Sequence, residues 1–279
     1  MSGVLELGRE GLKDRPKRPP INLKRVALPA EHGSWGILLE PLVASLAIAA
    51  SPAGWSAAIL VIGAFLLRQP SKVLVSDLTA GRDLPQTRAA ARFAAAFGSL
   101  ALIGAAVALA LGDPRDLLPL LLLVPIGAFQ LYNDVSRNSR GLVPELVGSA
   151  SISASAAAIA LAGGWGIAEA LALWALFVCR SVPSVVYVRQ RLRLEKGKPF
   201  NRVAPAALHL IAVVAVASLA SFGLVPMLPI AVFVFLLFRN VTGLSESRRK
   251  MKAMQIGIRE TVYGGILVLS VILGHYLGM

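Results

Sequence analysis

The sequence predicts an all-α protein, a polytopic membrane bundle of about nine transmembrane helices. The first observation is composition, since 56% of the 279 residues are hydrophobic and only 15% are charged, as in polytopic membrane proteins. The second is a series of nine apolar stretches, each close to the roughly 20 residues of a membrane span. The third is charge, because all but one of the 28 Lys and Arg residues fall on one side of the implied topology.

The nine apolar stretches follow one another without room for a separate soluble domain. They lie near residues 34–51, 55–75, 90–111, 117–132, 144–163, 167–188, 204–222, 225–239 and 257–277. Short, charge-poor connections alternate with long basic ones, and Arg115 is the single basic residue of the short connections. Because cytoplasmic loops collect Lys and Arg, this pattern predicts a cytoplasmic N-terminus and a C-terminus on the other side. Some stretches are shorter than a straight span needs, so short or broken helices beside a cavity are expected.

A basic arm, residues 1–28, precedes a single membrane domain at 29–279. The arm carries seven basic side chains and a proline-rich patch at 15–20, and it is too long and too broken by proline for the start of a signal peptide. We expect it to be disordered or to lie on the membrane surface. The net charge of +13 suits anionic lipid headgroups better than nucleic acid, because basic residues gather at cytoplasmic span ends. A phosphate-bearing cytosolic substrate stays open.

The entry to the first span is polar. Glu31 and His32 stand at its start, and His32, Gly36 and Glu40 share one helix face. Glu40 would lie about 10 Å inside the membrane, at 1.5 Å per residue. A carboxylate at that depth usually faces the bundle interior with a partner. These residues are candidates for proton transfer, and a structural ion pair is the alternative.

The second span ends in a mixture of cations and acids. Arg68 and Lys72 are four residues apart on one helix face, where they suit phosphate oxygens. Asp77 and Asp83 follow, and their carboxylates could hold a divalent ion such as Mg²⁺. An ordinary basic loop with compensating acids is the alternative.

The fourth span ends in a third polar cluster. Gln130, Asn133 and Asp134 share a helix face, so Asp134 is a further candidate metal ligand. A capped helix end followed by a turn is an equal alternative.

The fifth span is composed almost entirely of small residues between Gly148 and Ala156. Small residues let helices approach closely in lipid. We expect a helix at the centre of the bundle, and a serine-lined substrate path is the alternative.

The sixth span carries a buried cation. Arg180 lies two to three turns inside the membrane counted from Arg189, and it needs an acidic partner or an anionic ligand. Glu40 is the expected partner. Arg180, Ser184, Tyr187 and Arg191 form one stripe of the helix. The basic run from 189 to 198 is interpreted mainly as interfacial anchoring.

The last span opens with Arg259, Glu260 and Tyr263. These side chains could close the cytoplasmic mouth of the bundle, and a snorkelling charged helix start is an equal alternative.

The sequence resembles the YwiC-like family of bacterial membrane proteins. The stretches that carry the resemblance are Pro29–Leu39, Arg68–Arg88, Val143–Gly164, Arg180–Arg193 and Gly257–Gly264. The resemblance implies a multi-pass protein of the bacterial plasma membrane, and it brings no established activity.

A more distant resemblance is to the UbiA-type intramembrane prenyltransferases. That family has nine spans, a cytoplasmic N-terminus and an Asp-rich motif N-D-x-x-D-x-x-x-D followed by Arg-Thr. When Gln86-Thr87 is placed on the Arg-Thr, Asp77 falls on the middle aspartate, but the other motif positions carry Val73, Leu74 and Gly81. The second motif should follow the sixth span, where Glu195 is the one acid of 189–198. The resemblance implies the fold more than the reaction, because the Mg²⁺ ligands are largely lost.

The first functional hypothesis is a UbiA-like protein that binds an isoprenoid or other anionic amphiphile and possesses or has lost prenyltransferase activity. Phosphate binding is assigned to Arg68, Lys72, Arg180 and Arg189, with Tyr187 beside them. Mg²⁺ is assigned to Asp77, Asp83 and Asp134, and proton transfer to Glu31, His32 or Glu40. The alternatives are a small transporter with Glu40, Arg180 and Glu145 as coupling charges, and a non-catalytic membrane subunit.

Overall fold

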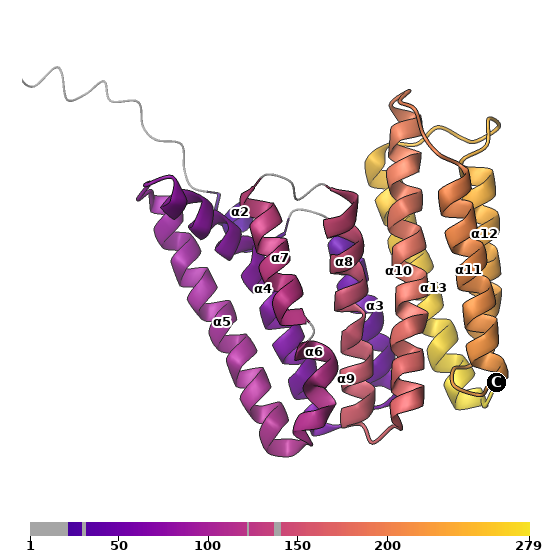
Figure 1. Ribbon diagram of the computed structural model, residues 1–279, viewed down its shortest axis with the longest axis horizontal. Coiled ribbons are helices and arrows are strands. Elements are labelled where there is room, and N and C mark those ends of the chain that lie inside the picture. Colours follow the sequence, from indigo (N-terminus) through magenta and orange to yellow (C-terminus); the bar gives the residue numbers. More distant parts are fainter. Residues whose placement is uncertain (1–21, 30–31, 122, 137–140) are drawn as a thin grey trace, which may run out of the picture.

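The computed structural model describes residues 22–29, 32–121, 123–136 and 141–279, and these residues form helices and no strands. The helices are α2 (Leu23–Ala27), α3 (His32–Ile48), α4 (Pro52–Thr79), α5 (Pro85–Leu111), the 3₁₀ turn η1 (Pro114–Leu117), α6 (Leu118–Leu121), α7 (Leu123–Val135), α8 (Leu142–Ile152), α9 (Ala154–Ala162), α10 (Ile167–Glu195), α11 (Val203–Ser221), α12 (Leu228–Gly243) and α13 (Ala253–Leu277). They run up and down in one antiparallel bundle (Figure 1).

Seven of the described segments are long and apolar enough to cross a membrane. Two shorter apolar helices, α3 with 17 residues and α12 with 16, account for the first and eighth stretches of the sequence. At 1.5 Å per residue each is about 25 Å long, slightly less than the hydrocarbon core. The all-helical, multi-pass prediction is therefore confirmed, and short helices occur where the sequence led us to expect them.

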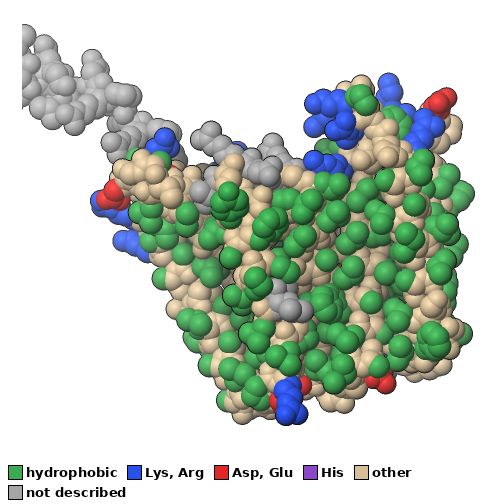
Figure 2. Space-filling model, in the orientation of Figure 1, with side chains coloured by type: hydrophobic (Ala, Val, Ile, Leu, Met, Phe, Trp, Pro, Cys, Tyr) green, Lys and Arg blue, Asp and Glu red, His purple; other side chains and the backbone are tan. Residues whose placement is uncertain are grey.

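Charge and apolar surface are separated along the bundle axis. Figure 2 shows most Lys and Arg side chains at one end of the visible face and apolar side chains over its flank. The segments 80–84, 196–202 and 244–252 lie at this end, and the C-terminus lies at the other (Figure 1). We call the first end the basic end. Large apolar side chains such as Leu102 and Val203 are more than two-thirds exposed on the described surface, as in a protein that faces lipid.

The α4–α5 hairpin is built around two glycines. A Cβ atom at Gly63 would stand 2.6 Å from the backbone nitrogen of Ala101, and one at Gly104 would stand 2.5 Å from that of Leu60. Because a backbone cannot rotate away as a side chain can, these positions require glycine. The two helices consequently touch along their backbones, as small residues permit in membranes.

The predicted small-residue helix is confirmed at the centre of the bundle, and it is broken. Ser153 separates α8 from α9, and α9 contacts α3, α4 and α10. The hydroxyl groups of Ser149, Ser151 and Ser153 donate to carbonyls three or four residues earlier, a back-bonding that bends helices. These serines therefore serve the helix itself.

The end of the predicted basic arm is folded. Helix α2 packs against α4 and α5, and the Gln69 side chain donates to the carbonyl of Arg25 at 2.9 Å. Val26 and Ala27 are buried. Residues 1–21 lie outside the described chain.

Candidate functional site

A cavity of about 560 Å³ opens among α3, α4, α8, α10 and α13. Its lining extends from Pro29, Gly33 and Gly257, at helix starts of the basic end, to Glu40 and Arg180 deeper in the bundle. The volume is that of an ordinary small-molecule site. Among the described residues, seven charged side chains line it, namely Glu40, Arg68, Lys72, Glu145, Arg180, Arg189 and Glu260. The four predicted phosphate-binding cations are thus brought to one cavity.

The uncharged part of the lining combines apolar side chains with small polar ones. Ile37, Phe65 and Ile152 contribute from three different helices, and Val185 and Leu192 contribute from α10. Such a mixture of a few charges with aliphatic walls suits a ligand with a polar head and an apolar chain.

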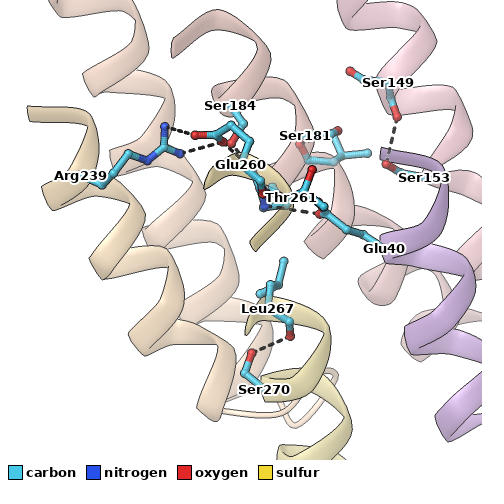
Figure 3. Close-up of polar contacts among 12 residues, drawn as sticks. Glu40, Ser149, Ser153, Ser181, Ser184, Arg239, Glu260, Thr261, Leu267 and Ser270 are labelled. Atoms are coloured by element: carbon cyan, nitrogen blue, oxygen red, sulfur yellow. Dashed lines mark hydrogen bonds and ion pairs between the residues drawn. The ribbon is translucent and has the colours of Figure 1, made fainter. Parts of the chain in front are cut away.

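Buried charges form the inner end of the cavity. The Arg180 Nε atom lies 3.4 Å from a carboxylate oxygen of Glu40, and Nη1 lies 3.5 Å from one of Glu260. Arg180 also donates to the Glu260 carbonyl at 2.8 Å and to the hydroxyl of Ser184. Glu260 reaches on to Arg239, whose Nη1 atom is 2.9 Å away. Figure 3 shows Arg239 directed at Glu260, with Ser184 beside them.

This network is electrically balanced, with two carboxylates and two guanidinium groups. The side chains of Arg180 and Arg239 are 4% and 8% exposed, and those of Glu40 and Glu260 are 11% and 14% exposed. Charges so far from water require partners, because desolvation otherwise costs several kcal/mol for each ion. The predicted pairing of Glu40 with Arg180 is confirmed.

A glycine of α13 makes room for Glu40. A Cβ atom at Gly264 of α13 would overlap the Glu40 carboxylate, and one at Gly36 would touch it at 3.8 Å. The close approach of α3 to α13 therefore lets the carboxylate reach Arg180.

The outer part of the cavity carries the remaining cations. Arg189 pairs with Glu145 at 3.1 Å, both side chains being about one-third exposed. Arg68 and Lys72 line the opposite side from α4. Arg180 and Arg189 are nine residues apart on one helix, so the cations span about 13 Å of depth.

Tyr187 does not line this cavity. Its ring lies 3.9 Å from the Arg239 guanidinium carbon, in a cation–π contact, and it faces a second, smaller cavity. Tyr187 and Arg189 therefore line different cavities.

Two of the three candidate metal ligands, Asp77 and Asp83, are engaged in other contacts. Asp77 is buried where α4 meets α5, and it accepts hydrogen bonds from Thr87 at 2.7 Å and Gln86 at 3.1 Å. Asp83 is exposed, and the Arg88 guanidinium, donating to it at 2.8 Å, lowers the pKa of its carboxyl. Both aspartates therefore have structural partners outside the cavity. In the part of the chain that the structure describes, no three His, Cys, Asp or Glu side chains form a metal-binding group.

Three assigned residues fall outside this description. Glu31 is not among the described residues, and His32 and Asp134 are described only as positions in α3 and α7. Their assigned roles stay predictions.

Two arginines were missed by sequence reasoning. Arg239 was placed at the end of an apolar stretch, although α12 continues to Gly243. Arg191 was interpreted as an interfacial anchor, but it is 1% exposed and donates to the carbonyls of Gly243 and Arg249. The available signal was a lone arginine followed by Asn240 within an otherwise apolar helix.

Comparison with known proteins bears on the first half of the chain. A family model described as YwiC-like protein matches residues 28–161. No curated protein and no solved structure matches the chain. The matched range holds four of the seven charged side chains of the cavity, namely Glu40, Arg68, Lys72 and Glu145. Residues 28–161 of this chain are thus similar to the YwiC-like family.

Proposed function

We propose that this integral membrane protein binds a phosphate-bearing, single-chain amphiphile, such as a prenyl diphosphate, in the cavity at its basic end. One observation carries the proposal: Arg68, Lys72, Arg180 and Arg189 line a single cavity to which aliphatic and aromatic side chains also contribute. Lys and Arg bind phosphate oxygens directly, and Arg does so in a bidentate manner.

The membrane orientation that accompanies the proposal follows the charge. The basic end faces the cytoplasm and the C-terminus the other side, since Lys and Arg collect on cytoplasmic loops. With α3 and α12 inserted alongside the seven longer segments, the bundle has nine spans in a bacterial plasma membrane. This arrangement is the one that the UbiA-type resemblance implies, with the cavity opening on the cytoplasmic side.

The proposal concerns binding and not prenyl transfer. A transferase needs groups that neutralise the departing diphosphate and a π face near the developing carbocation. Asp77 is engaged with α5, and the ring of Tyr187 is covered by Arg239. Glu40 is committed to Arg180, which leaves it poorly suited to proton transfer. We therefore propose that the cationic side chains bind the phosphate directly, without Mg²⁺.

A transporter is the second candidate, and one observation favours it. Glu260 lies between Arg180 and Arg239 and contacts both. If one arginine is displaced, Glu260 can keep an ion pair with the other. Exchange of partners within such a network is how buried charges couple to movement of a solute. The two candidates differ in outcome, since a transporter moves its ligand across a vesicle membrane and a binding protein does not.

Thermal unfolding of the detergent-solubilised protein tests the proposal. Geranylgeranyl diphosphate at about 100 times its Kd should add about 2.7 kcal/mol of stability, and geranylgeraniol, which lacks the phosphates, should add much less. Lys72→Gln should abolish most of the diphosphate effect, because Lys72 lines the cavity.

The matched control is Arg202→Gln, which removes a cation at the same end. Arg202 is half-exposed, pairs with Glu246 at 3.4 Å and lies outside the cavity, so the effect of the diphosphate should persist. Equal shifts from geranylgeraniol, or equal losses in the two variants, would refute the proposal. Vesicle uptake of the labelled ligand by the parent protein would favour the transporter.

A further inference from the structure

A second cavity, of about 360 Å³, lies between the end of α10, the end of α12 and the start of α13. In the described part of the chain its lining contains five arginines, namely Arg191, Arg239, Arg248, Arg249 and Arg259, and one acidic side chain, Glu260. Glu195 lies behind them, 2.8 Å from Arg191 and 3.6 Å from Arg248. Even with both carboxylates counted, the arginines are in excess.

Part of this cationic surface is buried, which distinguishes it from a solvated charged face. Arg191 and Arg239 are more than nine-tenths buried, and Arg248 is largely buried. Within the described chain, the Nε atoms of all three are buried and have no hydrogen-bond acceptor. A guanidinium has five donors in a fixed fork, so these three side chains keep hydrogen-bonding capacity that the described chain does not use.

The cavity is held open by specific contacts. Arg191 donates to the carbonyls of Gly243 and Arg249, which fastens the segment after α12 over the end of α10. Arg239 stacks on Tyr187 at 3.9 Å. The start of α13 adds the positive end of its helix dipole. Cationic donors are thereby positioned before any ligand arrives.

We propose that this second cavity, which we call the arginine pocket, binds a phosphoryl group. Clustered arginines match phosphate geometry and charge better than they match other small anions, because the guanidinium fork is bidentate and strongly basic. The group can be supplied by a soluble phosphate compound or by an anionic lipid headgroup at the membrane surface. The inference is independent of the proposed function, since the arginine pocket shares only Glu260 with the larger cavity.

Calorimetric titration of the full-length protein with inorganic pyrophosphate provides the test for a soluble source. The parent protein should bind, and Arg259→Gln, which alters an exposed arginine, should weaken binding at least tenfold. Arg248→Gln should have a similar effect. The control Lys250→Gln, an exposed cation in the same segment that is not part of the lining, should bind as the parent does. Lys72→Gln, in the larger cavity, tells which of the two cavities holds the anion.

A second arm tests the lipid source. The protein is placed in nanodiscs of phosphatidylcholine with or without phosphatidylglycerol, and its thermal unfolding is compared. Stabilisation by phosphatidylglycerol that is lost in Arg259→Gln but kept in Lys250→Gln would support a headgroup site. Binding of neither probe, or equal losses in Arg259→Gln and Lys250→Gln, would overturn the proposal. Loss of pyrophosphate binding in Lys72→Gln alone would also overturn it, because that result places the anion in the larger cavity.

Discussion

Substitution of Glu260 by glutamine tests the buried charge network most directly. The change keeps the shape of the side chain and removes the charge that lies between Arg180 and Arg239. Arg180 keeps Glu40 as a partner, whereas Arg239, which is 8% exposed, loses the carboxylate with which it pairs. One buried cation is left uncompensated. Breaking a buried pair typically costs 3–5 kcal/mol, and the partial exposure of Glu260 places our expectation at about 3 kcal/mol.

The assay is equilibrium unfolding in mixed micelles, followed by the fluorescence of the four tryptophans. Glu246→Gln is the matched control, because Glu246 pairs with Arg202 at the same end and is 91% exposed. Surface pairs contribute about 1 kcal/mol or less. A double variant, Glu260→Gln with Arg239→Gln, should lose less stability than the two single losses combined. If Glu260→Gln costs no more than Glu246→Gln, the charge network does not stabilise the bundle and the reasoning fails.

Three further predictions concern packing and local contacts. Gly104→Ala should lower the free energy of unfolding by about 1–3 kcal/mol, because the new Cβ atom overlaps the backbone of α4. Gly98→Ala should be tolerated, since a Cβ atom there meets its nearest atom at 4.0 Å. The same unfolding assay compares the two variants. Asp77→Asn should cost about 1–2 kcal/mol, since it weakens buried hydrogen bonds, yet it should leave diphosphate binding unchanged. Asp83→Asn, at an exposed site, should unfold almost as the parent does, and a larger loss than for Asp77→Asn would contradict this account. Arg191→Lys should speed tryptic cleavage within 244–252, because lysine cannot make both carbonyl contacts; unchanged cleavage would argue against the anchoring role.

The architecture and the deepest ion pair were predictable because membrane physics restricts both. A bilayer demands long apolar helices, so hydropathy located the elements that the structure contains. The same solvent makes a lone charge costly, which is why Glu40 and Arg180 could be paired across 140 residues. This reasoning missed Arg239 because the residue was placed at the end of an apolar stretch. A charged residue is common at that position and does not need a buried partner.

The helix face that carries Arg180, Tyr187 and Arg191 did not reveal that α10 contributes to two different cavities. Tyr187 and Arg191 lie within about 20° of Arg180 around the helix, at 100° per residue, whereas Val188 lies about 80° away. The larger cavity is lined by the Val188 side of the helix, and Arg180 reaches it from the edge. Periodicity groups the residues of one face, but the neighbours that this face meets are decided by tertiary packing.

The contacts of Arg180 also depend on the order in which its partners are synthesised. Glu40 leaves the ribosome 140 residues before Arg180, and Glu260 follows Arg180 by 80 more. At roughly 5–20 residues per second, Glu40 waits roughly 10 to 45 seconds before all the members of its network exist. Until Arg180 is made, the first span carries an uncompensated carboxylate, which disfavours its deep insertion. The last helix to be made, α13, is therefore the one that completes the burial of the first.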